Sequence, residues 1–312
     1  MTLSGKLPVI LSLDSYPEVE EILVVGCGGT GAYVISHLAR LISVVNRNRR
    51  TRRSTTYSYN RYNEIKLYLA DGDLVENKNL SRQHFIHQDI DRNKAEVLGE
   101  RYSAAFGIQI GVIPKDLEKA SDLGFLNLNG NNSTVVVGCV DNNASRKVIR
   151  EWFLGTKDGS MDNVHHQHNW SSKFWIDSGN EERNGQVVCG FRPSARGYYG
   201  SPKLNPAKFT KSARGEFSLP CATEVYPNLM DESDQFNSQV SCAERAESAP
   251  QNMQTNITAA TIVMNFLNKI IINEPLKSHC IEFSIDNIFS TKLNTPENLS
   301  VVNVIRRRDW EK

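Results

Sequence analysis

The sequence predicts an α/β protein built on a doubly wound, mostly parallel sheet, with helices on both faces and a C-terminal antiparallel extension. Three observations lead to this fold class. Apolar, strand-like runs alternate with segments of helical periodicity over the first 190 residues. A glycine-rich turn, GCGGTG, joins the first strand to the first helix. The composition, 39% hydrophobic and 23% charged, is that of a globular protein with a sizeable core.

The first half of the chain gives three strands and two helices in alternation. Residues 20–25 predict a strand, and the glycine turn after it leads into a helix over AYVISHLARLISVV. Residues 46–62 carry six arginines without apolar periodicity, so we expect an exposed loop or flexible insertion over 46–63. A second strand follows in IKLYLADGD, then a helix in DRNKAEVLGERYSAAFG and a third strand in IQIGVI.

The second half continues the pattern and then loses it. A fourth strand, TVVVGCVDN, leads into the helix ASRKVIREWFLG, and residues 173–176 and 186–191 read as further strands around DSGNEERNG. Residues 192–237 are rich in Pro, Gly and Ser, which predicts a long crossover. A helix is expected over 254–273 and terminal strands near CIEFSI and SVVNVI. We therefore expect 1–190 to form the core of a domain that 191–312 completes.

Charge and cysteine content exclude several classes of protein. Lys plus Arg number 36 against 35 Asp plus Glu, so no net field favours nucleic acid or membrane. The N-terminal residues lack a signal-peptide pattern and no run approaches roughly 18 apolar residues, so we expect a cytoplasmic protein. Six dispersed cysteines without a C-x-x-C pair predict reduced thiols and no zinc. His165, His166 and His168 lack partner ligands, and we assign them no role.

The glycine turn is the first candidate site. Its glycines satisfy G-x-G-x-x-G between a strand and a helix, where backbone N–H groups can approach phosphate. They are Gly26, Gly28, Gly29 and Gly31. A turn without a ligand is the alternative interpretation, and Cys27 reads as a packing residue. Asp71 and Asp73 end the second strand, where Asp71 could bond ribose hydroxyls of NAD or of another nucleotide.

Two further motifs give the chain a family resemblance. The segment DGDLVENKNLSRQHFIHQDIDRNKAEVLGERY contains D-x-D-x-V-x-x-x-N-L-x-R-Q followed by a lysine at a helix start, and GCVDN ends the next strand. With GCGGTG, these motifs resemble the ThiF, MoeB and ubiquitin-activating enzyme family over roughly residues 20–190. WIDSGNEERNGQVVCGFRP, YPNLMDESDQF and SCAERAESAPQNMQTNITAA resemble the ThiF-type protein of PRTRC systems, which extends the match to roughly residue 270.

The resemblance implies roles at individual positions. Asp71 would hold the ATP ribose beside Asp73, Asn79 and Arg82 the triphosphate, Gln83 the neighbouring loop, Lys94 the phosphates, and Asp141 a Mg²⁺ ion. The chemistry agrees, because attack on the α-phosphate builds negative charge that Arg and Lys stabilise. A carboxylate at a strand end suits Mg²⁺, which keeps most of its waters.

Cys242 is the candidate thioester nucleophile. Its context, SCAERAESAP, is similar to the crossover-loop cysteine of ubiquitin-activating enzymes. A thiolate that attacks an acyl-adenylate needs exposure and nearby positive charge, which Arg245 could supply. The alternative is a solvent-facing or structural cysteine. Cys221 competes, although the adjacent Pro220 favours an ordered loop.

The function implied by the resemblance is ATP-dependent adenylation of a C-terminal carboxylate. The partner would be a ubiquitin-like or sulfur-carrier-like small protein ending in glycine, and the enzyme a homodimer. The resemblance also implies N-terminal helices that supply an arginine in bacterial members, and a short segment, LPVILSL, stands in their place here. An arginine from 46–53 could substitute, but a solvated, flexible basic loop is the simpler interpretation. Docking of an acidic partner surface or of nucleic acid is the other use that such a loop could have. The missing zinc pairs depart from a MoeB-like enzyme.

Three alternatives remain at this stage. The same ATP site could adenylate a tRNA-linked carboxylate, as a threonylcarbamoyladenosine dehydratase does, with the basic loop contacting tRNA. A nucleotide-binding scaffold without catalysis is the second alternative. An NAD oxidoreductase is the third and ranks last, because it leaves Arg82, Lys94 and Asp141 unexplained.

Overall fold

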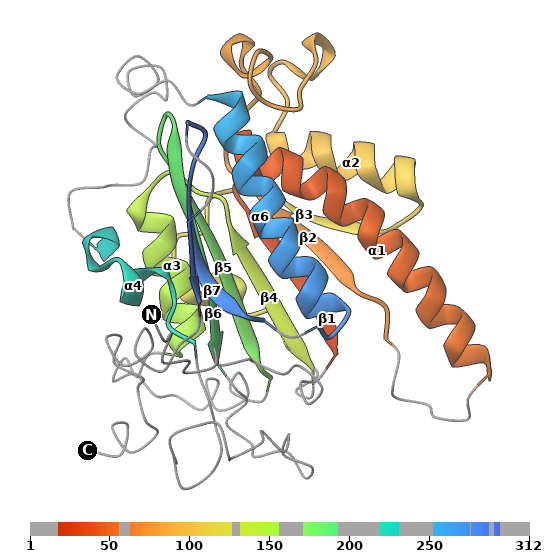
Figure 1. The fold of residues 1–312 in the computed structure, drawn as a ribbon. Coiled ribbons are helices and arrows are strands. Elements are labelled where there is room, and N and C mark those ends of the chain that lie inside the picture. Colours follow the sequence, from red (N-terminus) through yellow and green to blue (C-terminus); the bar gives the residue numbers. More distant parts are fainter. Residues whose placement is uncertain are drawn as a thin grey trace, which may run out of the picture.

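Strands from both halves of the chain form one mixed sheet. The computed structural model describes residues 18–55, 63–126, 132–155, 171–192, 219–230, 252–274, 276–286 and 290–293. Within these ranges the sheet has eight strands, in the order β3-β2-β1-β4-β5-β6-β7-β8 (Figure 1). They are β1 (Val19–Val25), β2 (Lys66–Ala70), β3 (Ile110–Ile113), β4 (Ser133–Gly138), β5 (Lys173–Asn180), β6 (Asn184–Arg192), β7 (Ser278–Ser284) and β8 (Ser290–Leu293).

The strand directions confirm the predicted fold class. Strands β3, β2, β1, β4 and β5 pair in parallel, whereas β6, β7 and β8 add antiparallel pairs at one edge. The chain runs outward from β1 to β3 and then returns to β4 on the other side of β1. The strand order therefore reverses between β1 and β4, which is where doubly wound sheets bind ligands.

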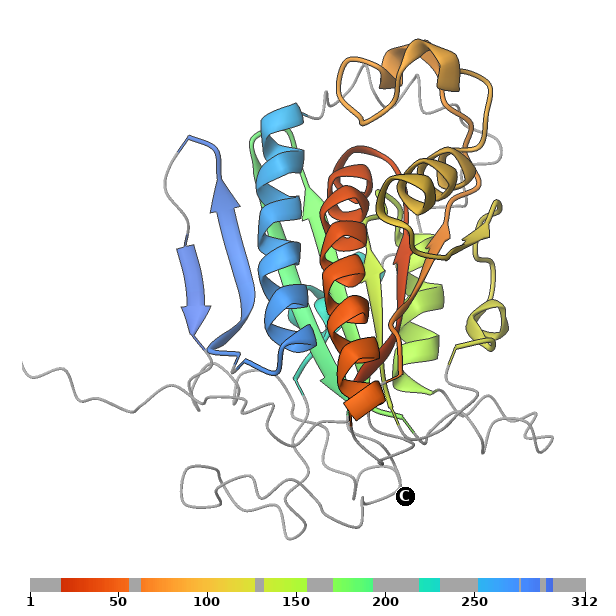
Figure 2. The ribbon, with the colours of Figure 1, turned by 90° about the vertical axis from the view of Figure 1, so that its right-hand side faces the viewer.

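Helices cover both faces of the sheet. On one face lie α1 (Gly29–Thr55), α2 (Lys94–Phe106) and α6 (Met253–Ile271), which stand side by side in Figure 2. On the other lie α3 (Asn143–Leu154), η3 (Ala120–Leu123), α4 (Ala222–Val225) and η6 (Pro227–Met230). The alternation of strand side chains divides the core: Ile22 and Val24 pack under α1, whereas Leu23 and Val25 pack with α3.

Side-chain caps fix where α2 and α3 begin. The Asn93 amide oxygen accepts from the N–H groups of the first turn of α2, and Asn142 does the same for α3. Both helices end at a glycine with positive φ, at Gly107 (63°) and Gly155 (65°). Because each of these helices follows a strand of the parallel sheet, the caps place both N-termini at the same edge.

The arginine-rich segment corrects a prediction. We expected an exposed loop from residue 46, but α1 continues to Thr55, so the prediction is wrong for 46–55; residues 56–62 lie outside the described ranges. Polar contacts replace the apolar periodicity. The buried Asn46 side chain bonds both backbone groups of Ile65, and buried Arg49 donates to the carbonyls of Val19 and Asn63.

The later elements match the expectations in part. Strands β5 and β6 extend to Asn180 and from Asn184, so most of the polar segment DSGNEERNG belongs to strands. Strand β7 confirms the terminal strand at CIEFSI, whereas β8 was not predicted and SVVNVI lies outside the described ranges. Within the expected crossover, residues 219–230 form a bridge to β6 followed by α4 and η6.

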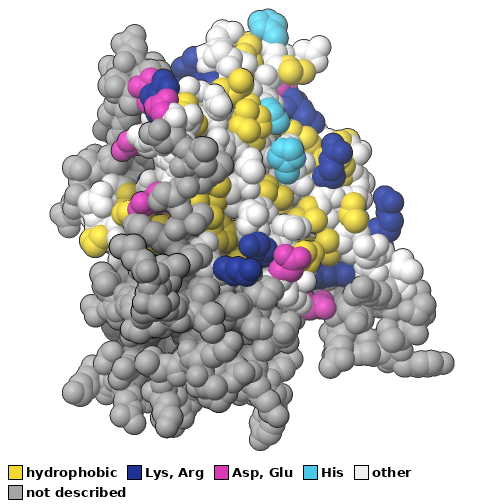
Figure 3. Space-filling view, in the orientation of Figure 1, with side chains coloured by type: hydrophobic (Ala, Val, Ile, Leu, Met, Phe, Trp, Pro, Cys, Tyr) yellow, Lys and Arg dark blue, Asp and Glu magenta, His cyan; other side chains and the backbone are white. Residues whose placement is uncertain are grey.

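The face that carries α1 and α6 is mixed in character. Figure 3 shows hydrophobic side chains there among Lys, Arg and His, and Val44 and Met253 are 51% and 47% exposed.

In the described part of the chain, no helix combines the length and apolar character needed to span a membrane.

Candidate functional site

A cavity of about 660 Å³ opens at the carboxyl ends of β1, β2, β4 and β5. It lies above the point where the strand order reverses. Ten of the eleven sequence-predicted nucleotide-site residues line it, namely Gly26, Gly28, Gly29, Asp71, Asp73, Asn79, Arg82, Gln83, Lys94 and Asp141. The eleventh, Gly31, lies beneath the turn. The motifs therefore converge on one site, although they are spread over more than a hundred residues.

Backbone contacts explain why the turn requires glycine. Gly26 has a φ of 89°, and a Cβ there would come 2.5 Å from the carbonyl oxygen of Cys139. A Cβ at Gly31 would overlap the carbonyl oxygen of Gly26. The turn thus packs against β4 on one side and the first turn of α1 on the other. The N-terminus of α1, at Gly29, opens on the cavity and can receive an anion.

Asp71 closes the turn from the β2 side. Its carboxylate accepts from the N–H groups of Cys27, at 2.5 Å, and Asp73, at 2.8 Å. Burial raises the pKa of Asp71 to about 6; nearby Lys94 opposes this shift and Asp73 adds to it. Because a carboxylate has about four lone-pair positions, it can still accept a ligand hydroxyl.

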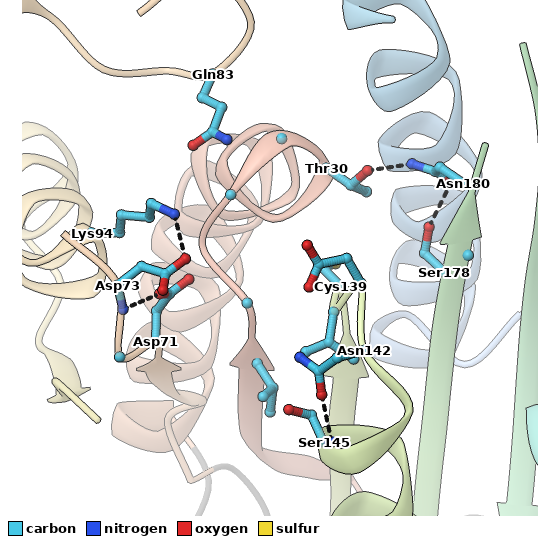
Figure 4. Close-up of a pocket in the computed structure, with 18 of the residues that line it drawn as sticks. Thr30, Asp71, Asp73, Gln83, Lys94, Cys139, Asn142, Ser145, Ser178 and Asn180 are labelled. Carbon is cyan, nitrogen blue, oxygen red and sulfur yellow. Dashed lines mark hydrogen bonds and ion pairs between the residues drawn. The ribbon is translucent and has the colours of Figure 1, made fainter. Parts of the chain in front are cut away.

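Lys94 is held against these carboxylates. It is the first residue of α2, its side chain is 7% exposed, and its Nζ lies 2.7 Å from Asp73 Oδ2 (Figure 4). The Asn93 amide donates to the carbonyls of Asp71 and Asp73, which ties the start of α2 to the end of β2. A cation is thereby fixed beside the glycine turn.

A short turn positions the next two predicted residues. In η1 (Asn77–Asn79), the side-chain oxygen of buried Asn79 accepts a hydrogen bond from Glu76 N–H. The backbone carbonyl of Asn79 accepts from the backbone N–H groups of Arg82 and Gln83. Among the described residues, the Arg82 side chain has no ion-pair partner. The Gln83 side chain lies over Gly28, with a buried Oε1 that has no hydrogen-bond partner within the described ranges. Asn79 therefore orients these residues, in addition to any contact it makes with a ligand.

Asp141 faces this group from the end of β4. It is exposed and directly precedes Asn142, the cap of α3. Nowhere in the described ranges do three or more His, Cys, Asp or Glu side chains gather as a metal site. A single carboxylate fits a Mg²⁺ ion that takes its other ligands from phosphate and water.

The structure adds a buried ion pair that sequence reasoning missed. The side chains of Arg146 and Asp177 are 6% and 2% exposed. Arg146 Nε lies 3.2 and 3.3 Å from the two carboxylate oxygens, and Nη2 donates to the carbonyls of Val140 (2.7 Å) and Ser178 (3.4 Å). Asp177 directly follows the strand that the sequence predicted over 173–176, but no local pattern indicated that it pairs with Arg146 of α3.

A polar network joins α1, β5 and α6 at the opposite rim. Asn180 Nδ2 donates to Thr30 Oγ1 at 2.6 Å (Figure 4). It also donates to Asn256 Oδ1 at 3.2 Å, and Thr30 donates to the same Asn256 oxygen at 3.3 Å. Asn256 is 1% exposed and would collide with a Cβ at Gly29. Thr30 and Asn180 line the cavity. Their place at the start of a helix and the end of a strand could have indicated both, but no sequence signal indicates Asn256.

Of the two candidate cysteine nucleophiles, the structure describes Cys221 but not Cys242. Cys242, Arg245 and the histidines at 165–168 lie outside the described residues. Cys221 is fully buried against Gly190 and Phe153, and burial raises its pKa to about 12. Cys27 is likewise buried, in agreement with a packing role. A nucleophilic role for Cys221 is therefore disfavoured.

The family comparison identifies the class of protein to which this fold and cavity belong. The model of the ThiF family matches residues 18–300, and the chain belongs to that family. A comparison with curated proteins gives no match.

Solved structures resemble the chain at the level of the fold. E. coli MccB with ATP is 16% identical, with a TM-score of 0.49, and the match covers 94% of this chain and 66% of that one. The microcin C7 biosynthetic enzyme MccB in complex with N-formylated MccA is 16% identical, with a TM-score of 0.50, and the match covers 94% of this chain and 67% of that one. PaaA is 13% identical, with a TM-score of 0.49, and the match covers 88% of this chain and 64% of that one. The chain thus spans just under two thirds of the length of MccB with ATP and of PaaA.

Proposed function

We propose that the protein is an ATP-dependent adenylyltransferase that activates the C-terminal carboxylate of a ubiquitin-like or sulfur-carrier-like small protein. Membership of the ThiF family supports ATP-dependent adenylation of a carboxylate. The observation that carries the proposal is the convergence of Arg82, Lys94 and Asp141 around one glycine turn. A glycine turn alone would serve many nucleotide-binding proteins.

The reaction needs charge stabilisation more than covalent help. A carboxylate oxygen of the carrier attacks the α-phosphorus of ATP. The bond from that phosphorus to the bridging oxygen breaks, and pyrophosphate leaves with the electron pair. The N-terminus of α1, Arg82 and Lys94 can stabilise the phosphoryl oxygens, and Asp71 can hold the ribose. The product is a mixed anhydride between the carrier and AMP.

Magnesium fits this arrangement. Asp141, exposed at the end of β4, would hold the ion together with the phosphates, and the ion would neutralise charge on the leaving pyrophosphate. The residues of the chain keep the separate task of orienting the carboxylate and the phosphates.

A thioester step at Cys242 is part of the proposal and rests on its sequence context. The thiolate would attack the carbonyl carbon of the acyl-adenylate, and AMP would leave. Cys221 is not a candidate for this step, because it is buried in the core. The proposed homodimer rests on the family resemblance, and light scattering of the purified chain tests it.

A tRNA-linked carboxylate is the weaker of the two proposed substrates. It depended on a basic loop, but among the arginines of 46–62, Arg49 is buried on backbone carbonyls and Arg50 pairs with Glu64 at 2.6 Å. Fewer cations are therefore available for a polyanion than the sequence indicated.

The test is ATP–pyrophosphate exchange with small β-grasp carriers that end in glycine. Wild type is compared with Asp141→Ala and Cys242→Ala, and with Glu151→Gln as a control, because Glu151 is exposed on α3 away from the cavity. We expect carrier-dependent exchange in wild type, Cys242→Ala and Glu151→Gln, and its loss in Asp141→Ala. A carrier–enzyme thioester should form in wild type and be absent in Cys242→Ala.

Two outcomes would change the proposal. Tight ATP binding without exchange toward any carrier would overturn it and favour a tRNA-linked carboxylate or a scaffold. Exchange that persists in Asp141→Ala would remove the role of Asp141 while leaving adenylation in place.

A further inference from the structure

The buried pair Arg146–Asp177 requires an explanation beyond stability. Removing two charges from water costs several kcal/mol per ion, and apolar pairs of similar volume are often at least as stable. Here Arg146 lines the cavity, and its partner Asp177 directly precedes Ser178, which also lines it. This position points to a role in the site.

Arg146 joins the ends of two neighbouring strands. Its Nη2 donates to Val140, the residue before Asp141, at 2.7 Å and to Ser178 on β5 at 3.4 Å. Asp177 accepts from Nε of the same guanidinium with both carboxylate oxygens. A planar fork can serve these directions together, whereas the ammonium of lysine is a point charge.

Asp141 depends on such support. Its side chain is exposed and has no hydrogen bond or ion pair to another described residue. Its position therefore follows from the backbone on either side. Asn142 is fixed through its cap bond to Ser145 N–H at 2.8 Å, and Val140 through Arg146.

We propose that Arg146, held by Asp177, is a positioning residue that sets Asp141 for Mg²⁺-dependent nucleotide binding. The inference rests on the proposed function, because it takes Asp141 as the carboxylate that acts with the metal and ATP. Supporting residues behind a metal ligand typically change affinity or activity by about 10- to 100-fold when they are replaced. Arg146 acts through the Val140–Asp141 backbone and not by contact with the phosphates.

The test compares two variants with a matched control. Arg146→Lys keeps the charge and removes the fork. The double variant Arg146→Met with Asp177→Leu removes both charges, so that no unpaired charge is left buried. Arg150→Lys is the control, since Arg150 lies one turn further along α3 and does not line the cavity. Urea denaturation confirms that each variant folds.

The first measurement is ATP affinity by calorimetry, with and without Mg²⁺. We expect all variants to bind metal-free ATP within about threefold of wild type. The gain in affinity on adding Mg²⁺ should fall by at least about tenfold in Arg146→Lys and in the double variant, and should persist in Arg150→Lys. Adding Asp141→Ala to the double variant should produce little further loss, because residues that act as a unit are not additive.

The outcomes separate this inference from the proposed function. A Mg²⁺ gain that survives in the folded double variant, or that is absent in wild type, overturns the inference. Equal losses from Arg146→Lys and Arg150→Lys would also overturn it, because a general effect on α3 would then explain both. If wild type exchanges no pyrophosphate with any carrier, the proposed function fails, but the metal-dependent affinities still decide the role of Arg146.

Discussion

The raised pKa of Asp71 gives a prediction with a defined sign. The carboxyl has a pKa of about 6 in the folded protein against 3.8 for an ordinary aspartate, mainly because of burial, with Lys94 opposing and Asp73 adding to the shift. The folded state therefore holds the proton more tightly than the unfolded chain. The free energy of unfolding loses a contribution as the pH rises from about 4 to about 6, and the loss is complete above the folded pKa.

The magnitude follows from the two pKa values. The difference between a pKa of about 6 and one of 3.8 corresponds to about 3 kcal/mol over the full titration. Between pH 5 and pH 7.5 the change is smaller, because part of the titration lies below pH 5, and integration of the proton linkage gives about 1.4 kcal/mol. The ionised form still persists at neutral pH, where its two N–H donors and Lys94 stabilise it.

The assay is urea denaturation of wild type and Asp71→Asn at both pH values. The other titrating groups cancel in the difference between the two proteins. We expect the stability of Asp71→Asn relative to wild type to increase by about 1.4 kcal/mol from pH 5 to pH 7.5. The control, Glu151→Gln, removes an exposed carboxylate and should show no such increase. A relative stability of Asp71→Asn that stays constant or decreases would refute the raised pKa of the Asp71 carboxyl.

Three further predictions use the same site and its surroundings. Gly31→Ala forces a methyl group into the carbonyl of Gly26, so it should lower the free energy of unfolding in urea by about 1–3 kcal/mol and weaken ATP binding. The control Gly107→Ala adds a methyl group in open space at a positive φ, so it should lower that free energy by about 1 kcal/mol and leave ATP binding unchanged. Lys94→Met should weaken ATP binding at least tenfold by calorimetry, as expected for a lost charge-assisted contact of about 1.5–3 kcal/mol; affinity within twofold of wild type would exclude a phosphate role. Cys221 should resist maleimide labelling in the native protein and react only in denaturant, and rapid native labelling would contradict its burial.

Local motifs account for the part of the site that the sequence predicted. The glycine turn, the acids after β2 and the lysine at the start of α2 are close in sequence to the strand ends that place them. Since parallel strands bring their carboxyl ends to one edge, the motifs could be expected to meet there. Cys242 remains a prediction, because it lies outside the described residues.

Long-range packing accounts for what the sequence did not predict. Asn256 comes from α6, 226 residues after its partner Thr30, and no local pattern indicates that its amide packs against the glycine turn. The helix over 46–55 was missed for a related reason: its buried face carries Asn46 and Arg49, whose partners are backbone carbonyls of other segments. Apolar periodicity does not detect a face that is buried through polar contacts.

The two walls of the cavity offer different groups to the anions of the proposed reaction. Lys94 and Lys115 belong to the β2–β3 side, which also carries carboxylates. The β4–β5 side presents hydroxyl and amide groups from Ser145, Ser178 and Asn180, together with charged residues, namely Asp141, Arg146, Glu181 and Glu182. ATP and the attacking carboxylate are both anions and repel each other in a water-poor site. The lysines of the β2–β3 side can hold the triphosphate, while the hydroxyl and amide groups of the β4–β5 side can orient a carboxylate through hydrogen bonds. Asp141 belongs to the β4–β5 side and lines the same cavity, so the support that Arg146 gives to the backbone of Val140 bears on how the site holds both anions.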